Sequence, residues 1–168
     1  MCQELASRKA YCDYALMVGA STNNAASIAK LAGQAAGLKM YLNDTFTTLR
    51  MDSVSDWSKH FDAWPRNAPL CVHAEGRTTA AAILIAALHD RPLHVCHVAR
   101  REEIEVIRAA KAKGLPITCE VAPHHLFLCE CVGRVIRRDA VDHVQIVPER
   151  LLVITRNKDG PHLALLGP

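Results

Sequence analysis

Residues 69–97 read PLCVHAEGRTTAAAILIAALHDRPLHVCH, and this stretch decides the fold. It contains two short apolar runs, residues 69–73 and 93–97, and each run ends in a histidine. Between them, an alanine-rich segment from about residue 78 to residue 89 predicts a helix. Two strands joined by a helix are typical of a parallel sheet whose helices cover its outside.

The same alternation of strand and helix continues on both sides of this stretch. The apolar runs predict five strands, at residues 14–18, 37–42, 69–73, 93–97 and 116–120. Helices are predicted from the N-cap candidates Ser21 and Thr22 to residue 36, and at residues 53–63, 78–89 and 101–113. This order predicts an α/β fold, namely about five central βα units of a partial (β/α)8 TIM barrel, because a complete barrel needs eight strands in about 250 residues.

A polar residue that can bind a metal or move a proton lies on each of four consecutive predicted strands. These residues are Lys39, His73, His97 and Glu120. A (β/α) barrel builds its catalytic site from side chains at the carboxyl ends of its strands. The pattern therefore indicates a metal hydrolase.

Each of these side chains also has an ordinary structural interpretation. Lys39 either reaches solvent from a strand end or, as a neutral buried amine, reacts with carbon dioxide to form a carbamate that bridges two metals. The two histidines are zinc ligands or structural residues. Glu120 is a ligand, a group that orients a histidine, or a salt-bridge partner. The neighbouring Cys96 is either a soft metal ligand or an inert buried thiol.

Two further segments lie at the expected carboxyl ends of the strands. Residues 43–52 form a long polar loop with Thr45 and Phe46 near its tip, and this loop is either a lid over a small polar ring or an ordinary connection. His124 and His125 line the mouth of a pocket, or one of them caps the turn that follows.

The composition excludes several classes of protein. The 168 residues suit one domain, and the net charge of +3 comes without a long basic run, so we expect no nucleic-acid partner. The polar amino terminus lacks a signal-peptide core, and the longest apolar run, residues 80–88, is too short to span a membrane. Seven cysteines, an odd number, indicate reduced thiols and a cytoplasmic location.

Four segments resemble the dihydroorotase family of the amidohydrolase superfamily. They are residues 37–43 (GLKMYLN), 71–75 (CVHAE), 94–99 (HVCHVA) and 118–126 (TCEVAPHHL). The resemblance extends from about residue 3 to residue 130. It is closest to the branch that animals fuse to carbamoyl-phosphate synthetase and aspartate transcarbamoylase.

The resemblance implies an amidohydrolase barrel that converts N-carbamoyl-L-aspartate reversibly to dihydroorotate in pyrimidine synthesis. It implies two zinc ions bridged by a carbamate on Lys39, with His73 and His97 as ligands of the second zinc. By the same resemblance, Glu120 and Cys96 match the position of an additional metal in the animal branch. The loop that contains Thr45 and Phe46 matches the family's mobile substrate loop.

The sequence also departs from the family. The His-x-His pair that binds the first zinc and the aspartate that serves as general base have no counterpart in it, so we expect the chain alone to be inactive. Residues 131–168 resemble nothing in the family and are expected to come from an alternative exon or a gene-model artefact. Within them, residues 144–147 and 151–155 predict a hairpin.

Two other functions remain compatible with the sequence. A non-catalytic, truncated isoform would use the open edges of its sheet to associate with itself or with the full-length protein. Another amidohydrolase, such as a dihydropyrimidinase, would share the barrel but not the amino-acid sequence of residues 118–126.

Overall fold

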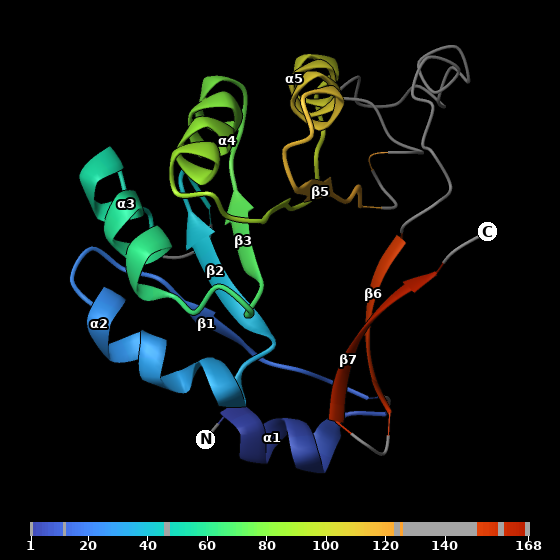
Figure 1. Ribbon diagram of the computed structural model, residues 1–168. Helices are drawn as coiled ribbons and strands as arrows, with labels where there is room; N and C mark the ends of the chain where they lie inside the picture. The colour runs from blue at the N-terminus through green and yellow to red at the C-terminus, as the bar shows by residue number, and fades with distance from the viewer. Residues whose placement is uncertain are drawn as a thin grey trace, which may run out of the picture.

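A computed structural model of the chain describes residues 2–11, 13–45, 48–122, 125, 151–157 and 160–166. Five short parallel strands form its central sheet, in chain order from β1 to β5 (Figure 1). They are β1 (Met17–Gly19), β2 (Gly37–Tyr41), β3 (Leu70–His73), β4 (Leu93–Val95) and β5 (Ile117–Cys119). The prediction of five strands in a parallel sheet is confirmed.

Helices connect the successive strands, and α3, α4 and α5 lie in sequence order along one side of the sheet (Figure 1). The helices are α1 (Cys2–Lys9), α2 (Ala25–Ile28), the 3-10 helix η1 (Ala29–Gln34), α3 (Val54–Ala63), α4 (Arg77–Leu88) and α5 (Arg101–Ala112). Helix α1 is not predicted by the sequence pattern, whereas α3, α4 and α5 begin and end close to their predicted limits. No helix in the described part of the chain is long and apolar enough to cross a membrane.

The connection between β1 and β2 differs from its prediction. The expected continuous helix begins later, at α2, and its second part tightens into η1. The side chain of Asn24 explains the late start, because its Oδ1 accepts the N–H of Ser21 at 2.8 Å and its Nδ2 donates to the carbonyl of Gly19 at 3.1 Å. The Asn24 side chain thus closes residues 19–24 into a local turn, and the helix begins after it.

The strand register sorts side chains onto two faces of the sheet. Lys39 is aligned with Cys71, Cys71 with His94, and His94 with Thr118. Aligned residues of parallel strands point the same way and successive residues alternate, so these polar side chains share one face. The intervening residues share the other face and are buried: Leu38, Met40, Leu70, Val72, Leu93 and Val95.

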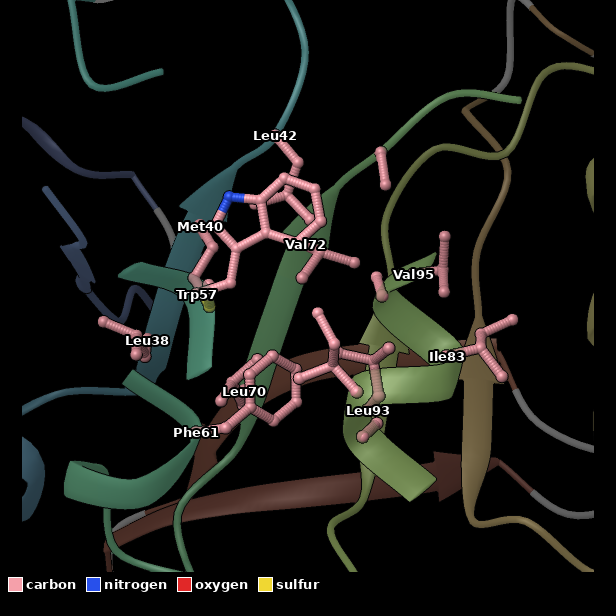
Figure 2. Close-up of a cluster of buried hydrophobic side chains, with 14 of the residues drawn as sticks. Leu38, Met40, Leu42, Trp57, Phe61, Leu70, Val72, Ile83, Leu93 and Val95 are labelled. Atoms are coloured by element: carbon pink, nitrogen blue, oxygen red, sulfur yellow. The ribbon is translucent and has the colours of Figure 1, made fainter. Parts of the chain in front are cut away.

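The apolar face of the sheet packs against the helices (Figure 2). Trp57 and Phe61 of α3 and Ile83 of α4 belong to the same buried cluster as the strand residues. The Trp57 indole donates to the carbonyl of Met51 at 2.8 Å, so its N–H is paired although the ring is buried. Burying a large apolar side chain stabilises the fold by about 1.5–3 kcal/mol, so this layer is the main source of stability for the sheet.

A buried guanidinium joins the end of α3 to the start of β4. Arg91 is 2% exposed. Its Nη1 donates to the carbonyl of Phe61 at 2.8 Å and to that of Trp64, and its Nη2 donates to the carbonyl of Pro65 at 2.9 Å. The last carbonyls of a helix have no partner within the helix. Arg91 therefore caps the C-terminal end of α3.

Replacing Arg91 with methionine should lower the free energy of unfolding by about 2–3 kcal/mol, because buried carbonyls would lose their donor. Urea denaturation measures this loss. Arg66→Met is the matched control, since Arg66 donates to the carbonyls of His89 and Asp90 from an exposed position and should cost less than about 1 kcal/mol. Equal losses in the two variants would show that the burial of Arg91 has no energetic consequence.

Two further strands form an antiparallel pair of their own. β6 (Leu151–Asn157) aligns with β7 (Gly160–Leu166), so that Leu151 faces Leu166 and Asn157 faces Gly160. The predicted hairpin pairs residues 151–155 with residues 144–147, which lie outside the described residues, so that pairing stays a prediction. The structure adds β7 as a partner of β6.

Candidate metal centre

The residues predicted to form a site come from neighbouring strands and lie on the face opposite the apolar core. They occupy two layers of that face. Lys39 is aligned with Cys71, and two residues further along the strands Tyr41 is aligned with His73. Lys39 is thus the middle residue of β2 and lies one layer deeper than His73, whereas the sequence pattern had suggested a position at a strand end.

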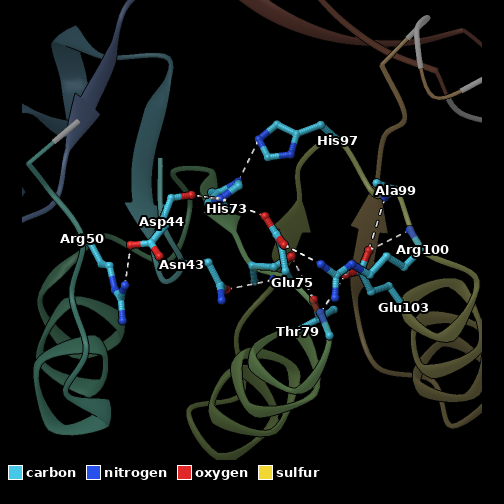
Figure 3. A network of polar contacts seen from close by, with 12 residues as sticks. Asn43, Asp44, Arg50, His73, Glu75, Thr79, His97, Ala99, Arg100 and Glu103 are labelled. Atoms are coloured by element: carbon cyan, nitrogen blue, oxygen red, sulfur yellow. Dashed lines mark hydrogen bonds and ion pairs between the residues drawn. The ribbon is translucent and has the colours of Figure 1, made fainter. Parts of the chain in front are cut away.

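The two predicted histidine ligands face each other (Figure 3). His73 ends β3, and His97 follows β4. Nδ1 of His73 lies 3.4 Å from Nε2 of His97. Their ring centroids are 4.8 Å apart, and the rings are inclined at 53°. The sheet therefore brings two imidazole nitrogens from successive strands close enough to share a ligand.

A backbone carbonyl fixes the orientation of the first of these rings. Nε2 of His73 lies 3.1 Å from the carbonyl oxygen of Asp44. Because a carbonyl only accepts hydrogen bonds, Nε2 carries the proton and Nδ1 presents its lone pair toward His97. Histidines that bind metals commonly donate their second nitrogen to a carbonyl or carboxylate in this way. Oε1 of Glu75 lies 3.5 Å from the same Nε2.

The second ring is held in its uncharged form. Burial lowers the pKa of His97, and the positive charge of Lys39 lowers it further. Neutral imidazole is the form that coordinates zinc, so no proton has to be displaced when a metal binds at neutral pH.

The backbone at His97 adopts a left-handed conformation, with φ of 40°. Residues other than glycine rarely adopt it. Hydrogen bonds on both sides hold the residue there, since Cys96 donates to the carbonyl of Val72 at 3.0 Å and Val98 donates to the carbonyl of Glu120 at 2.8 Å. The turn directs the ring back toward His73.

A second group of potential ligands lies beside the histidine pair. One donor atom each from His94, Cys96 and Glu120 lies within 4.8 Å of the others. Nδ1 of His94 is 2.9 Å from Oγ1 of Thr118. Its Nε2 is buried, 3.5 Å from Oε2 of Glu120, with no closer hydrogen-bond partner among the described residues.

The sequence pattern indicated Cys96 and Glu120 but missed His94. The signal was present, because His94 precedes Cys96 by two residues and so points to the same face of the strand. In the sequence pattern, a histidine at the end of an apolar run indicates a ligand more clearly than a histidine in the middle of one. Alignment of the strands was needed to place it beside Glu120.

Attraction between opposite charges shifts the pKa values of His94, Cys96 and Glu120. Burial lowers the pKa of His94, but the Cys96 sulfur and the Glu120 carboxylate raise it more, to about 9. The same contact lowers the pKa of Glu120. A hydrogen bond with Cys71 lowers the pKa of Cys96, and His94 and Lys39 add to this effect. The group thus combines a thiolate, a carboxylate and an imidazole, which together suit a divalent cation once the imidazole loses its proton.

The amine of Lys39 lies near both groups of candidate ligands. Its Nζ lies 5.6 Å from the centre of the Tyr41 ring, within the range of a cation–π contact. Its charge also contributes to lowering the pKa values of His97 and Glu120. Lys39 therefore acts electrostatically on both groups of donors.

The loop after β2 closes at its base and contacts the histidine pair. Tyr41 and Arg50 form a parallel bridge between its two ends, and Arg50 makes an ion pair with Asp44. Asp44 is also the residue whose carbonyl faces His73. Thr45 follows it and is half-buried, whereas Phe46 lies outside the described residues.

His125 forms two hydrogen bonds with a residue that precedes it in the chain. Its Nδ1 accepts the N–H of Ala122 at 3.3 Å, and its own N–H donates to the carbonyl of Ala122 at 2.9 Å. These bonds do not test whether His125 lines the mouth of a pocket or caps the turn that follows, so both roles stay predictions. His124 lies outside the described residues.

The chain is similar to known proteins over most of its length. The chain is 59% identical over 128 residues to the multifunctional protein CAD of Squalus acanthias, and 46% identical over 131 residues to the multifunctional protein pyr1-3 of Dictyostelium discoideum. A dihydroorotase of Lactiplantibacillus plantarum is 46% identical over 57 residues. The chain is a partial relative of the dihydroorotases. The matches cover 76%, 77% and 34% of this chain, but 6%, 6% and 13% of those proteins.

Solved structures extend the relationship to the fold. An inactive dihydroorotase-like domain of a CAD-like multifunctional protein from Chaetomium thermophilum is 34% identical, with a TM-score of 0.63 over 71% of this chain and 35% of that one. An L-hydantoinase from Arthrobacter aurescens, 20% identical, has a TM-score of 0.60 over 68% of this chain and 33% of its own, and supports the fold alone. No family model matches the chain. The described sheet is thus part of a TIM barrel of the amidohydrolase type.

The electrostatics of the group formed by His94, Cys96 and Glu120 predict the titration of His94. Its imidazole should titrate near pH 9, and Cys96→Ala and Glu120→Gln should each lower its pKa, because each removes a neighbouring negative charge. Imidazole resonances followed by NMR across the pH range measure this. Glu105→Gln, an exposed substitution on α5, should change nothing. Titration of His94 near 6.5 in the unaltered chain would contradict the prediction.

Proposed function

We propose that this chain carries the part of a dihydroorotase-type site that binds the second zinc ion. The observation that carries the proposal is the approach of Nδ1 of His73 to Nε2 of His97, with the Asp44 carbonyl on the far side of the first ring. Two imidazoles from successive strands, one of them already oriented by a backbone acceptor, meet the usual requirements of a zinc ligand pair.

The donors suit zinc better than a hard cation such as Mg²⁺, because imidazole and thiolate are softer ligands than carboxylates and water. When bound, the metal pair supplies an activated water and a Lewis acid for opening or closing a cyclic amide. The residues of this chain prepare the site. Asp44 keeps the proton of His73 on Nε2, and burial together with Lys39 keeps His97 neutral.

Lys39 is proposed to become a carbamate. Its ammonium group would first lose one proton, and the neutral amine would then attack carbon dioxide and lose a second, so that the side chain changes from a cation to an anion and two protons pass to solvent. The new anion would lie near Glu120 and Cys96, so it would need a positive counter-charge to persist. Carbamylation and metal binding would therefore depend on each other.

The remaining donors and the loop complete the proposal. Cys96 and Glu120, joined by His94, would hold an additional metal ion, which their mutual distances allow. The loop with Thr45 and Phe46 would contact the substrate, N-carbamoyl-L-aspartate or dihydroorotate, because its neighbour Asp44 already touches the histidine pair.

Catalysis would need residues that this chain does not supply. The sequence contains no His-x-His pair and no aspartate in the setting of the family's general base. Loss of a general base alone costs about 10²–10⁴-fold in rate. The similar domain from Chaetomium thermophilum is itself described as inactive. We therefore expect the site to bind metal without turning over substrate.

The sheet favours a second candidate function, association with another barrel. Within the described sheet, β1 and β5 each pair with one neighbour, so each leaves one edge free to pair. The partner would be a second copy of this chain or a full-length multifunctional protein that contains the same barrel. Co-purification at a defined stoichiometry would support this function, and polydisperse aggregation would count against it.

Bound metal is the first test of the proposal. After equilibration with Zn²⁺ and gel filtration, the chain should retain zinc, and His73→Ala or His97→Ala should weaken binding by at least about tenfold. Elemental mass spectrometry counts the metal, and intact mass should show the addition of one carbon dioxide at Lys39.

His89→Ala is the matched control for these variants. His89 is a half-buried histidine that contacts Ser58 and Asp62 on the helices, away from the polar face of the sheet. Its replacement should leave zinc binding unchanged. A chain that is folded but retains no zinc would refute the proposed site.

A turnover assay checks the expected lack of catalysis. The zinc-loaded chain should neither hydrolyse dihydroorotate nor cyclise N-carbamoyl-L-aspartate above background, because the general base is missing. Consumption of substrate followed by absorbance or chromatography measures this. Turnover that disappears in His73→Ala would show that another residue of this chain replaces the missing base.

A further inference from the structure

A buried carboxylate near the start of α5 takes no part in the proposed metal site. Glu103 is the third residue of α5 and is 2% exposed. A charge buried this deeply must be paired or hydrogen-bonded to persist. Its contacts therefore show what it stabilises.

Part of this carboxylate serves its own helix. Oε2 of Glu103 accepts the N–H of Arg100 at 3.1 Å and that of Ala99 at 3.3 Å. A glutamate at the third position of a helix commonly bonds back to the N-cap, and its negative charge suits the N-terminal end of the helix. These two contacts alone would describe an ordinary helix cap.

The other oxygen reaches a different loop. Oε1 of Glu103 accepts the N–H of Gly76 at 2.7 Å, the shortest of its three hydrogen bonds, and lies 4.0 Å from Nε of Arg100. Gly76 precedes α4, has a φ of 53° that favours glycine, and belongs to the loop after β3. A single carboxylate thus binds the loop after β3 and the loop after β4 at once (Figure 3).

Both loops begin at a proposed zinc ligand. Gly76 is three residues after His73, and Arg100 is three residues after His97. The carboxylate therefore binds each loop three residues after the histidine at which the loop begins. Because each span is so short, a change in the separation of the loops would move the rings relative to each other.

Neighbouring polar contacts connect the same two loops. Nη2 of Arg100 lies 3.0 Å from Oε2 of Glu75, and Oε1 of Glu75 lies 3.5 Å from Nε2 of His73. On the other side, Oδ1 of Asn43 accepts the N–H of Glu75 at 2.9 Å. These contacts are more exposed than Glu103, so the buried carboxylate is the firmest of the links.

We propose that Glu103 is a positioning residue, which sets the distance between His73 and His97 by holding together the loops that follow them. The proposal rests on the proposed zinc site. It assigns Glu103 a role beyond capping α5, because a cap would need no contact with Gly76.

Two variants separate these roles. Glu103→Gln removes the charge and replaces one acceptor oxygen with an amide donor, which cannot accept the N–H it faces. Glu103→Asp keeps the charge at the start of α5 but is one methylene shorter, so it should no longer span both loops. Glu102→Gln is the matched control, since Glu102 is the preceding residue of the same turn and is exposed.

The 168-residue chain is compared with the three variants at a temperature where circular dichroism shows each of them folded. Co²⁺ serves as the metal probe, because its visible absorption reports both affinity and ligand geometry. Both Glu103 variants should bind Co²⁺ at least about tenfold more weakly than the unaltered chain. Glu102→Gln should bind as the unaltered chain does. Co²⁺ affinities and spectra that do not change in the Glu103 variants would overturn the proposal.

A second measurement needs no metal and keeps the inference independent of the proposed function. In the metal-free chain, nuclear Overhauser contacts between the rings of His73 and His97 should be present, and they should weaken in both Glu103 variants. If the unaltered chain binds no Co²⁺, the proposed zinc site fails, and these contacts alone decide the positioning role. Ring contacts that persist unchanged in a folded Glu103 variant would refute it.

Discussion

The alternation of side chains across a parallel sheet is the constraint on which the rest of this structure depends. Because neighbouring residues of a strand point to opposite faces, β2, β3 and β4 bury Leu38, Val72 and Val95 against the helices and present polar groups on the other side. Shifting any one strand by a single residue would exchange the two faces. The hydrophobic core therefore also sets the register of the candidate metal centre.

Much of the fold follows from the sequence, because strands and helices of a βα unit each have their own hydrophobic period. The strand ending in His73, the helix α4 and the strand leading to His97 all lie near their predicted positions. The helix after β1 was predicted too early, since the competing hydrogen bonds of Asn24 carry no periodic signal. The pairing of β6 with β7 was not predicted, because local pattern does not specify which strands pair.

The sequence indicated most residues of the candidate site, but it did not predict how their side chains are arranged in space. The sequence pattern indicated Lys39, His73, His97, Cys96 and Glu120, but it did not give their relative heights, and the register places Lys39 a layer below His73. The sequence pattern indicated neither His94 nor Glu103, for a related reason. A buried histidine within a strand and a glutamate in the first turn of a helix both have common structural roles, and contacts between separate units were needed to reveal more.

The left-handed backbone of His97 has a consequence for how this chain can change. A glycine or asparagine at this position would adopt the same φ at lower energy, and so would relieve strain of about 1 kcal/mol. Such a replacement would also remove a ring that faces His73. Selection for stability alone would thus favour loss of the histidine. A lineage that no longer needed metal at this position would be expected to lose His97 early, while the strands around it kept their packing.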